Sequence, residues 1–297
     1  MVEKSNSKFS VCIVQNLVTP DKDKNLNRVL EMIDSSVKLY SPDLIVLAEY
    51  FNCPLEKNYA LDFAEDENDS STLRALGESA KKNNVYLIAG TIPTKTNTPK
   101  ISNTCFCFDN KGEIKAKYRK VHLFDVDIPG KIKFCESEKT IPGDAEDFIT
   151  TFETPFATFG IGICYDIRFS EQCQLLKKLK NIDCMVYLSA FSIPTGTLHW
   201  DLLSRARAVD NNVHVIMSSQ SRNYNNPDAH QIFGGSRVVD PFGNVLNTLC
   251  YEEGVLYSIV DLQLNKNVAD QIPTWKNRKN EIYDVILKKD ENKNNSK

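Results

Sequence analysis

Cys164 lies where an apolar segment ends at a polar turn, and chemistry is most clearly indicated at this position. The run from Phe159 to Cys164 contains two glycines, and Ser170 with Glu171 then opens a stretch whose leucines fall at helical spacing. The pattern predicts a strand, a sharp turn and a helix. A thiol on such a turn lies near backbone N–H groups that can bind an oxyanion and near the positive end of a helix, and both favour a thiolate.

A nucleophilic cysteine also needs a base, because an ordinary thiol has a pKa of about 8.5. Glu49 follows five consecutive apolar residues in the segment from Asp43 to Phe51, so it is expected at a strand end and partly desolvated. Lys120 ends a segment in which apolar and basic residues alternate, and the alternation places it on the apolar side. A buried lysine is costly unless it is paired, so it should meet a carboxylate or an oxyanion.

Each of these three residues has an ordinary explanation when taken alone. An isolated cysteine after a strand is usually an inert core thiol, a glutamate there is usually a surface carboxylate, and a lysine in a hairpin usually reaches solvent. The combination is what indicates a catalytic site. The eight other cysteines are assigned to packing, and the pair Cys105 and Cys107 shares one face of a strand but lacks the further ligands of a zinc site.

Glu49 in LAEYF, Lys120 in YRKVHLF and Cys164 in GICYDIRF together resemble the Glu-Lys-Cys triad of the carbon–nitrogen hydrolase (nitrilase) superfamily. Two longer segments, Asp125 to Ser137 and Ala190 to Asn211, are similar to its omega-amidase branch. The resemblance extends from about residue 9 to residue 287. Three motifs in the family's order make it specific.

The coarse pattern of the chain alternates strands with helices, ending in two strands around the PFGN turn at Pro241 to Asn244. Both half-polar and fully apolar strands occur, which suits an α/β fold with a mixed sheet between helices and a second sheet. The resemblance implies the specific architecture, a four-layer α-β-β-α sandwich of the nitrilase type formed by a single domain over residues 1–287. Residues 288–297 lack apolar side chains and are expected to form a disordered tail.

The resemblance also implies roles for the site residues. Glu49 would act as general base, the Cys164 thiolate would attack a carboxamide carbon, and water would hydrolyse the resulting thioester. The Lys120 ammonium and the backbone N–H of Tyr165 would hold the oxyanion. Glu136 matches a second glutamate that the family often uses in support of the lysine or the substrate amide. No metal or organic cofactor is required.

Substrate choice must come from other side chains. Arg168 lies four residues after Cys164 and could hold a substrate carboxylate with two parallel hydrogen bonds, although a structural ion pair with Asp166 or a neighbouring carboxylate is an alternative. Phe191 and Thr195 belong to the loop expected before a helix that begins near residue 198, and they are candidates for the pocket wall. Two further arginines are expected on a helix surface or in an interface: Arg205 and Arg207.

The composition of the chain limits which partners it can bind and which cellular compartment it suits. The chain has 297 residues, 41% of them hydrophobic, and a formal net charge of −3, which argues against nucleic acid as a partner. The first eight residues are polar and lack the apolar region of a signal peptide, so none is expected, and no apolar run reaches the roughly 20 residues that span a bilayer, so no membrane association is expected. Nine cysteines and thiolate catalysis suit a reducing compartment, and the expected location is cytoplasmic.

The resemblance favours an omega-amidase acting on a small-molecule amide, namely a dicarboxylate monoamide such as 2-oxoglutaramate or succinamate. The alternatives are a deaminated-glutathione amidase, an N-carbamoyl-amide hydrolase, or a catalytically silent binding or scaffold protein of the same fold. A thiol-redox protein would need a second cysteine near Cys164, and Cys173 lies too far along the helix. A homodimer formed through a helical face near the nucleophile is expected by analogy.

Overall fold

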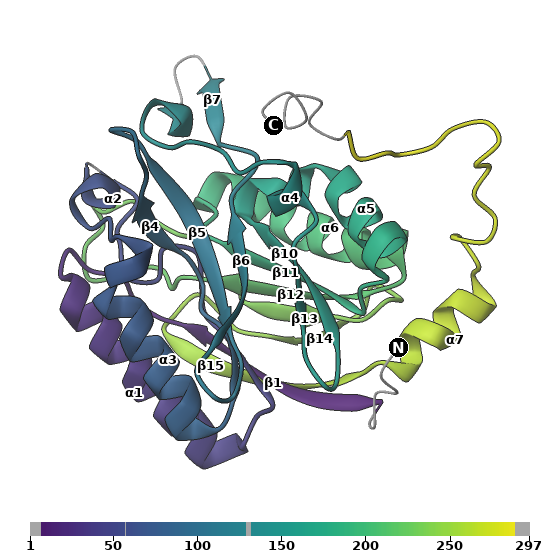
Figure 1. The fold of residues 1–297 in the computed structure, drawn as a ribbon, viewed down its shortest axis with the longest axis horizontal. Coiled ribbons are helices and arrows are strands. Elements are labelled where there is room, and N and C mark those ends of the chain that lie inside the picture. Colours follow the sequence, from purple (N-terminus) through teal and green to yellow (C-terminus); the bar gives the residue numbers. More distant parts are fainter. Residues whose placement is uncertain (1–6, 57, 129–131, 289–297) are drawn as a thin grey trace, which may run out of the picture.

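Two β-sheets packed face to face, with helices on their outer sides, form the centre of the computed structural model, which describes residues 7–56, 58–128 and 132–288 (Figure 1). Within these residues the first sheet has the order β15-β1-β2-β3-β5-β4, and β6 pairs with β5. Its strands are β1 (Lys8–Gln15), β2 (Leu44–Val46), β3 (Tyr86–Ile88), β4 (Ile92–Lys95), β5 (Ile101–Phe108), β6 (Ile114–Arg119) and β15 (Gly254–Asp261).

The second sheet has the order β14-β13-β12-β11-β10-β9. Its strands are β9 (Thr151–Glu153), β10 (Thr158–Ile163), β11 (Cys184–Ser189), β12 (His214–Ser219), β13 (Arg237–Val239) and β14 (Val245–Thr248). A separate hairpin pairs β7 (Asp125–Ile128) with β8 (Ile132–Cys135). Strands β10, β11 and β12 run parallel, so their carboxyl ends meet at one edge of the sheet.

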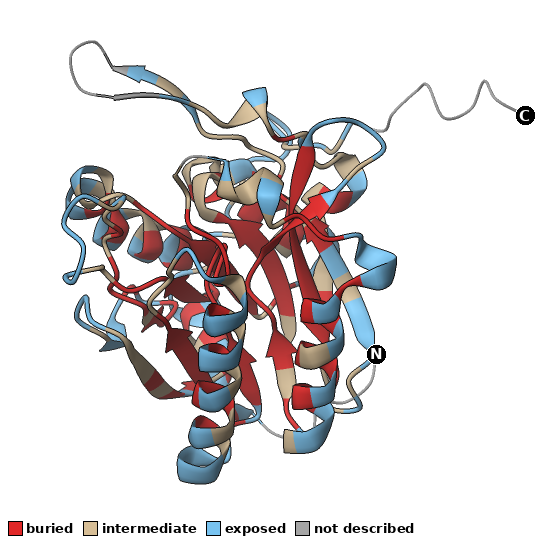
Figure 2. Ribbon diagram, turned by 90° about the vertical axis from the view of Figure 1, so that its left-hand side faces the viewer, coloured by how far each residue is buried: buried red, intermediate tan, exposed pale blue. Residues whose placement is uncertain are grey.

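The helices bury an apolar stripe against the outer faces of the sheets, while their other sides face solvent (Figure 2). Helices α1 (Lys22–Tyr40) and α3 (Ser71–Asn83) cover the first sheet, and α5 (Ser170–Lys180) and α6 (Ile193–Asn211) cover the second. A third apolar cluster fills the space between the two sheets. These four layers confirm the predicted α-β-β-α sandwich.

Helix ends follow the local sequence signals. Asp21 accepts a hydrogen bond from the backbone N–H of Lys24 at the start of α1, and Ser70 does the same for Leu73 at the start of α3. At their carboxyl ends, Ser41 and Asn84 adopt the left-handed conformation that stops a helix. The remaining short helices are α2 (Tyr59–Asp62), η1 (Glu67–Asp69), η2 (Glu136–Glu138), α4 (Ala145–Phe148), η3 (Cys164–Arg168) and α7 (Gln263–Gln271).

Several elements differ from the sequence prediction. Strand β15 was not expected; it joins the first sheet by pairing antiparallel with β1 along its whole length. Helix α6 begins at Ile193, about five residues before the predicted start near residue 198, and a proline lies in its first turn. The tail predicted to be disordered lies, except for Lys288, outside the described residues, as do Pro129 to Lys131 of the omega-amidase-like segment.

The chain after α7 runs outward from the body of the molecule (Figure 1), and two of its residues, Arg278 and Asp284, contact α5. Lys178 of α5 forms an ion pair with Asp284, and Arg278 lies over the ring of Trp275. Trp275 donates a hydrogen bond to the carbonyl of Asn211 at the end of α6, so it packs on its own chain. In the part of the chain that the structure describes, no helix has the length and apolar composition needed to cross a membrane.

Candidate active site

Cys164 lies on a strained turn at the carboxyl end of β10, as the sequence predicts. Its φ is 49°, in the left-handed region that non-glycine residues seldom adopt. The two glycines of β10 allow close packing beneath it, since a Cβ at Gly162 would lie 2.8 Å from the ring of Tyr187. The turn is held by Asp166, which accepts a hydrogen bond from the backbone N–H of Ile163 at 2.8 Å. This geometry lifts the thiol off the end of the strand.

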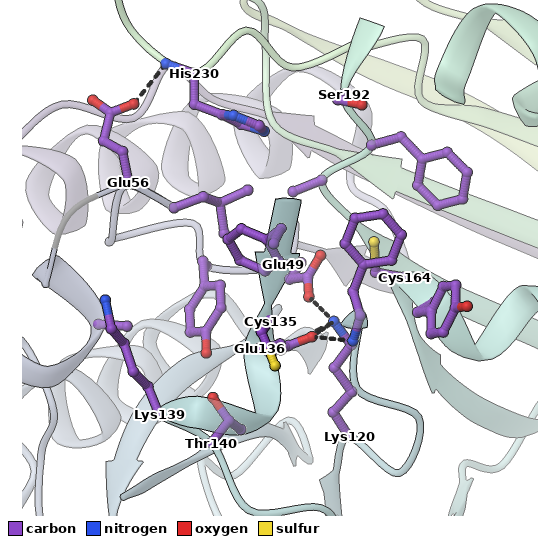
Figure 3. A pocket seen from close by; sticks show the side chains of 18 of the residues that line it. Glu49, Glu56, Lys120, Cys135, Glu136, Lys139, Thr140, Cys164, Ser192 and His230 are labelled. Carbon is purple, nitrogen blue, oxygen red and sulfur yellow. Dashed lines mark hydrogen bonds and ion pairs between the residues drawn. The ribbon is translucent and has the colours of Figure 1, made fainter. Parts of the chain in front are cut away.

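Glu49, Lys120 and Glu136 form one buried charge cluster beside that thiol (Figure 3). The Lys120 Nζ lies 3.0 Å from Glu49 Oε1 and 2.9 Å from Glu136 Oε2, and the lysine and Glu49 side chains are each 3% exposed. Glu136 also accepts a hydrogen bond from the backbone N–H of Phe124 at 2.8 Å. The structure therefore brings together the three predicted triad residues and places Glu136 in contact with the lysine.

Burial determines the protonation of this cluster. Burial raises the pKa of Glu49 above its ordinary value of 4.5, and the adjacent Lys120 ammonium opposes that rise. For Lys120 itself, burial would lower the pKa, but the two carboxylates outweigh it and raise the pKa well above its ordinary value. Glu49 is therefore a carboxylate whose basicity is raised, paired with a permanently charged ammonium.

The Cys164 thiol remains protonated in this resting arrangement. Burial and the negative charge of Glu49 raise its pKa well above the ordinary value, although Lys120 and the backbone N–H of Ala190 act in the opposite direction. Any effect of the turn that favours a thiolate is therefore outweighed in the resting state by burial and by the charge of Glu49, so the thiol needs a base. The thiol lies beside the Glu49 carboxylate, whose charge contributes to this rise in the pKa of the thiol and which can accept its proton.

Asp166 connects the lysine segment to the nucleophile turn. This fully buried carboxylate accepts hydrogen bonds from the Tyr118 hydroxyl at 2.6 Å and from the backbone N–H of His122 at 3.0 Å. Tyr118 and His122 flank Lys120 at two residues on either side, so Asp166 fixes the lysine segment relative to Cys164. This role of Asp166 was not predicted from the sequence, which suggested it only as a partner for Arg168.

Arg168 lies at the end of η3 and lines the same cavity as the triad. Its Nη1 lies 3.1 Å from His199 Nδ1, and its guanidinium carbon lies 5.2 Å from the centre of the Phe191 ring. The alternative ion pair with Asp166 does not form, because that carboxylate is occupied by Tyr118 and His122. Within the described residues the Arg168 guanidinium has no carboxylate partner.

Phe191 and Thr195 both line the cavity, as predicted, but Thr195 lies in the first turn of α6 instead of in a loop. Phe191 is buried and packs edge-on against Trp200. Arg207 was expected on a helix surface or in an interface and is buried within the chain instead: its Nε donates to the carbonyl of Ile167 at 2.9 Å and thereby supports the nucleophile turn. Tyr165 follows the nucleophile in the first turn of η3, where backbone N–H groups lack helical partners.

The cavity that these residues enclose has a volume of about 500 Å³. Further polar side chains also line it: Tyr50, Glu56, Glu138, Lys139, Thr140 and His230. Cys135 also lines it, and Cys250 is exposed, so these two cysteines do not serve the packing role assigned to them. Across residues 7–56, 58–128 and 132–288, no group of three or more His, Cys, Asp or Glu side chains has a metal-binding arrangement.

Comparisons with known proteins agree with this geometry. The family model for carbon–nitrogen hydrolases matches residues 10–270. Omega-amidase NIT2 of Xenopus tropicalis is 41% identical over 283 residues, which cover 95% of this chain and 99% of that protein, and its Mus musculus namesake is 40% identical with the same coverage. The crystal structure of Saccharomyces cerevisiae Nit3, a member of branch 10 of the nitrilase superfamily, superposes with a TM-score of 0.82 at 36% identity, covering 92% of this chain and 97% of that one.

Proposed function

This chain belongs to the carbon–nitrogen hydrolase family and is an amidase, a hydrolase of carbon–nitrogen bonds other than peptide bonds, and from that premise we propose that it is an omega-amidase. Its proposed substrates are dicarboxylate monoamides such as 2-oxoglutaramate and succinamate, and its products are the dicarboxylate and ammonia. The similarity to the two omega-amidases named above supports this assignment.

One observation carries the proposal further than the similarity does. The cavity is lined by the Cys164 thiol with its charged partners and also by the Arg168 guanidinium. Within the described chain this guanidinium has no carboxylate partner. A guanidinium can bind a carboxylate through two parallel hydrogen bonds. An amide that also carries an acid group would fit both features.

The proposed reaction begins when Glu49 removes the Cys164 proton and the thiolate attacks the amide carbon. The Lys120 ammonium and the Tyr165 backbone N–H stabilise the oxyanion of the tetrahedral intermediate. Protonated Glu49 then gives its proton to the departing ammonia, which leaves a thioester on Cys164. Water activated by Glu49 hydrolyses that thioester and releases the acid.

The chain should also act as a single catalytic domain over residues 1–287. The apolar cluster between the sheets contains Val11 and Val46 of the first sheet together with Ile161 and Val186 of the second. Either sheet alone would expose its inner face to water, so the two sheets are expected to fold as one unit.

A homodimer is proposed from the surface of α6. Leu198, Leu202 and Val209 are respectively 69%, 60% and 44% exposed, and their spacing places them on one side of the helix with Arg205. A second copy of this chain would bury this side. Light scattering should give twice the monomer mass, and Leu202→Asp should shift the protein toward monomer; a monomeric wild type would contradict the proposal.

A reducing compartment, the cytoplasm, is proposed because the reaction needs a free thiol. All nine cysteines are free, and Cys105 and Cys107 remain unbridged although their sulfur atoms lie 4.0 Å apart.

The decisive experiment measures ammonia release from a panel of amides by the purified protein. The panel contains 2-oxoglutaramate, succinamate, deaminated glutathione, an N-carbamoyl amide and the neutral amide butyramide. We expect the highest kcat/KM on the two dicarboxylate monoamides and no turnover with Cys164→Ser, since a hydroxyl is far less acidic than a thiol. Preference for deaminated glutathione or for the N-carbamoyl amide would replace the proposal with that alternative. Activity on none of them would favour a binding protein.

A further inference from the structure

Asn103 contacts both charged members of the proposed triad from the strand beside them. It lies on β5, where Thr104 pairs with Arg119, so Asn103 comes opposite Lys120 just beyond the end of β6. Its side-chain Nδ2 donates to Glu49 Oε1 at 2.9 Å, and its backbone carbonyl accepts from the Lys120 backbone N–H at 2.9 Å. Asn103 is fully buried, so water does not compete for these contacts.

The two hydrogen-bond donors of this cluster converge on the same oxygen of Glu49. Oε1 accepts from Lys120 Nζ at 3.0 Å and from Asn103 Nδ2 at 2.9 Å. A carboxylate oxygen has two lone pairs, so these donors occupy both on Oε1. The oxygen left with free lone pairs for the Cys164 proton is Oε2.

We infer that Asn103 is a positioning residue for catalysis, which holds Oε1 of Glu49 together with Lys120 and so makes Oε2 the oxygen that accepts the Cys164 proton. This inference rests on the proposed role of Glu49 as the base. The proton moves from sulfur to Oε2 when the thiolate forms and from Oε2 to the departing nitrogen when ammonia leaves. It cannot migrate to Oε1 meanwhile, because two donors already point at that atom.

The two ends of the Asn103 amide differ in their hydrogen bonding. Its Oδ1 is buried and has no hydrogen-bond partner within the described residues. A buried polar atom without a partner destabilises the fold. In Asn103 only the end that faces Glu49 is paired.

The test removes the Asn103 N–H donor and measures the effect on the titration of Glu49. Asn103→Leu removes the amide, and Asn103→Asp keeps the shape of the side chain but loses the N–H donor. The matched control is Ser102→Ala, because Ser102 is the buried neighbour of Asn103 on β5 and its hydroxyl has no partner among the described residues. The readouts are the pH profile of kcat/KM and the pH dependence of Cys164 alkylation by iodoacetamide. Alkylation needs no amide substrate, so it reports on Asn103 even if the proposed substrates fail.

Losing a donor to a carboxylate raises that carboxylate's pKa, so the acid limbs of both profiles should move to higher pH in both Asn103 variants. We expect kcat to fall about 10- to 100-fold with KM within about two-fold, and Ser102→Ala to behave as wild type. Unmoved acid limbs with lower thermal stability would mean that Asn103 is merely structural and would overturn the inference. Failure of the base role itself is recognised separately, because Glu49→Gln would then leave alkylation unchanged.

Discussion

Tyr50 and Cys164 share the same left-handed backbone conformation, with φ of 47° and 49°, and both line the cavity. Each follows the carboxyl end of a parallel strand, β2 or β10. This conformation costs roughly 1–2 kcal/mol at a residue with a Cβ, so neighbouring hydrogen bonds must stabilise it. Asp166 does so for the cysteine turn, and Gln220 donates to the Tyr50 carbonyl at 3.0 Å. Both residues thus hold a strained backbone in the wall of the cavity that Glu49 also lines.

The strain at Cys164 predicts an unusual order of stability among inactive variants. Cys164→Ala keeps a Cβ in the left-handed region, whereas Cys164→Gly has none. We expect the glycine variant to have a free energy of unfolding about 1 kcal/mol higher than the alanine variant, the reverse of the usual preference. Equilibrium unfolding in urea measures the difference. Equal stabilities, or a more stable alanine variant, would show that the turn is relaxed.

Removal of the buried ammonium should destabilise the protein in a pH-dependent way. In Lys120→Met, Glu49 and Glu136 would face each other without a cation, and breaking a buried ion pair typically costs about 3–5 kcal/mol. The folded-state pKa of Glu49 is already raised, and loss of Lys120 raises it further. Stability contributed by a group with a raised folded pKa is present at low pH and lost as pH rises through that pKa.

The deficit of Lys120→Met should therefore be larger at about pH 8 than at about pH 5. Urea unfolding of both proteins at the two pH values measures it. The matched control is Lys117→Met, because Lys117 is 42% exposed and its ion pair with Glu67 should contribute little. A deficit of the same size at both pH values would mean that packing alone explains the loss.

Local patterns in the sequence predicted the features that depend on neighbouring residues. The strand, turn and helix around Cys164 are confirmed, because apolar periodicity and turn residues act over a few positions. The alternating segment before Lys120 does form a strand, β6, for the same reason. Strand β15 has partly alternating burial, yet its partner β1 lies more than 200 residues away, and pairing at that distance leaves no local mark.

Contacts made only in the folded state were not predictable in this way. Arg207 has the surroundings of a surface residue in sequence, and only folding brings it to the carbonyl of Ile167. Asn103 has no motif that separates it from a packing residue, and the register of β5 with β6 places it beside Glu49. The protonated state of Cys164 depends on burial, which motif matching does not measure.

His214 should make the protein sensitive to acid. It is fully buried at the start of β12, and its Nδ1 lies 2.8 Å from Asn265 Oδ1. Asn265 uses its Nδ2 to donate to the carbonyl of Asp183, so its Oδ1 accepts and His214 Nδ1 carries the proton. The His214 Nε2 is buried without a partner among the described residues, and burial lowers the pKa of His214 from 6.5 to about 4.

Between pH 6.5 and about pH 4, His214 therefore binds a proton in the unfolded chain but not in the folded chain. The free energy of unfolding falls as the pH falls through this range. At about 1.4 kcal/mol per pKa unit, the loss attributable to His214 is about 3 kcal/mol. His214→Gln should be less stable than wild type near neutral pH, and the gap should close by about that amount toward pH 4. Urea unfolding across this range measures the gap. A constant gap would mean that the pKa of His214 is the same in the folded and the unfolded chain.

Arg168 is the residue on which the proposed preference for acid-bearing amides most depends. Arg168→Lys keeps the charge but loses the planar group that binds a carboxylate through two hydrogen bonds. We expect kcat/KM on succinamate to fall about 10- to 100-fold, mainly through KM, with butyramide nearly unaffected. Steady-state ammonia release on both substrates gives the ratio.

A structural Arg168 would give a different result, since its contacts with His199 and Phe191 also support the cavity wall. Loss of those contacts would lower the thermal stability and reduce the rate on succinamate and butyramide by the same factor. Arg205→Lys is the matched control, because Arg205 lies on the same layer of helices, half-exposed and outside the cavity lining. The ratio of kcat/KM for the two substrates therefore separates the roles: a fall confined to Arg168→Lys supports the carboxylate anchor, and an unchanged ratio removes it.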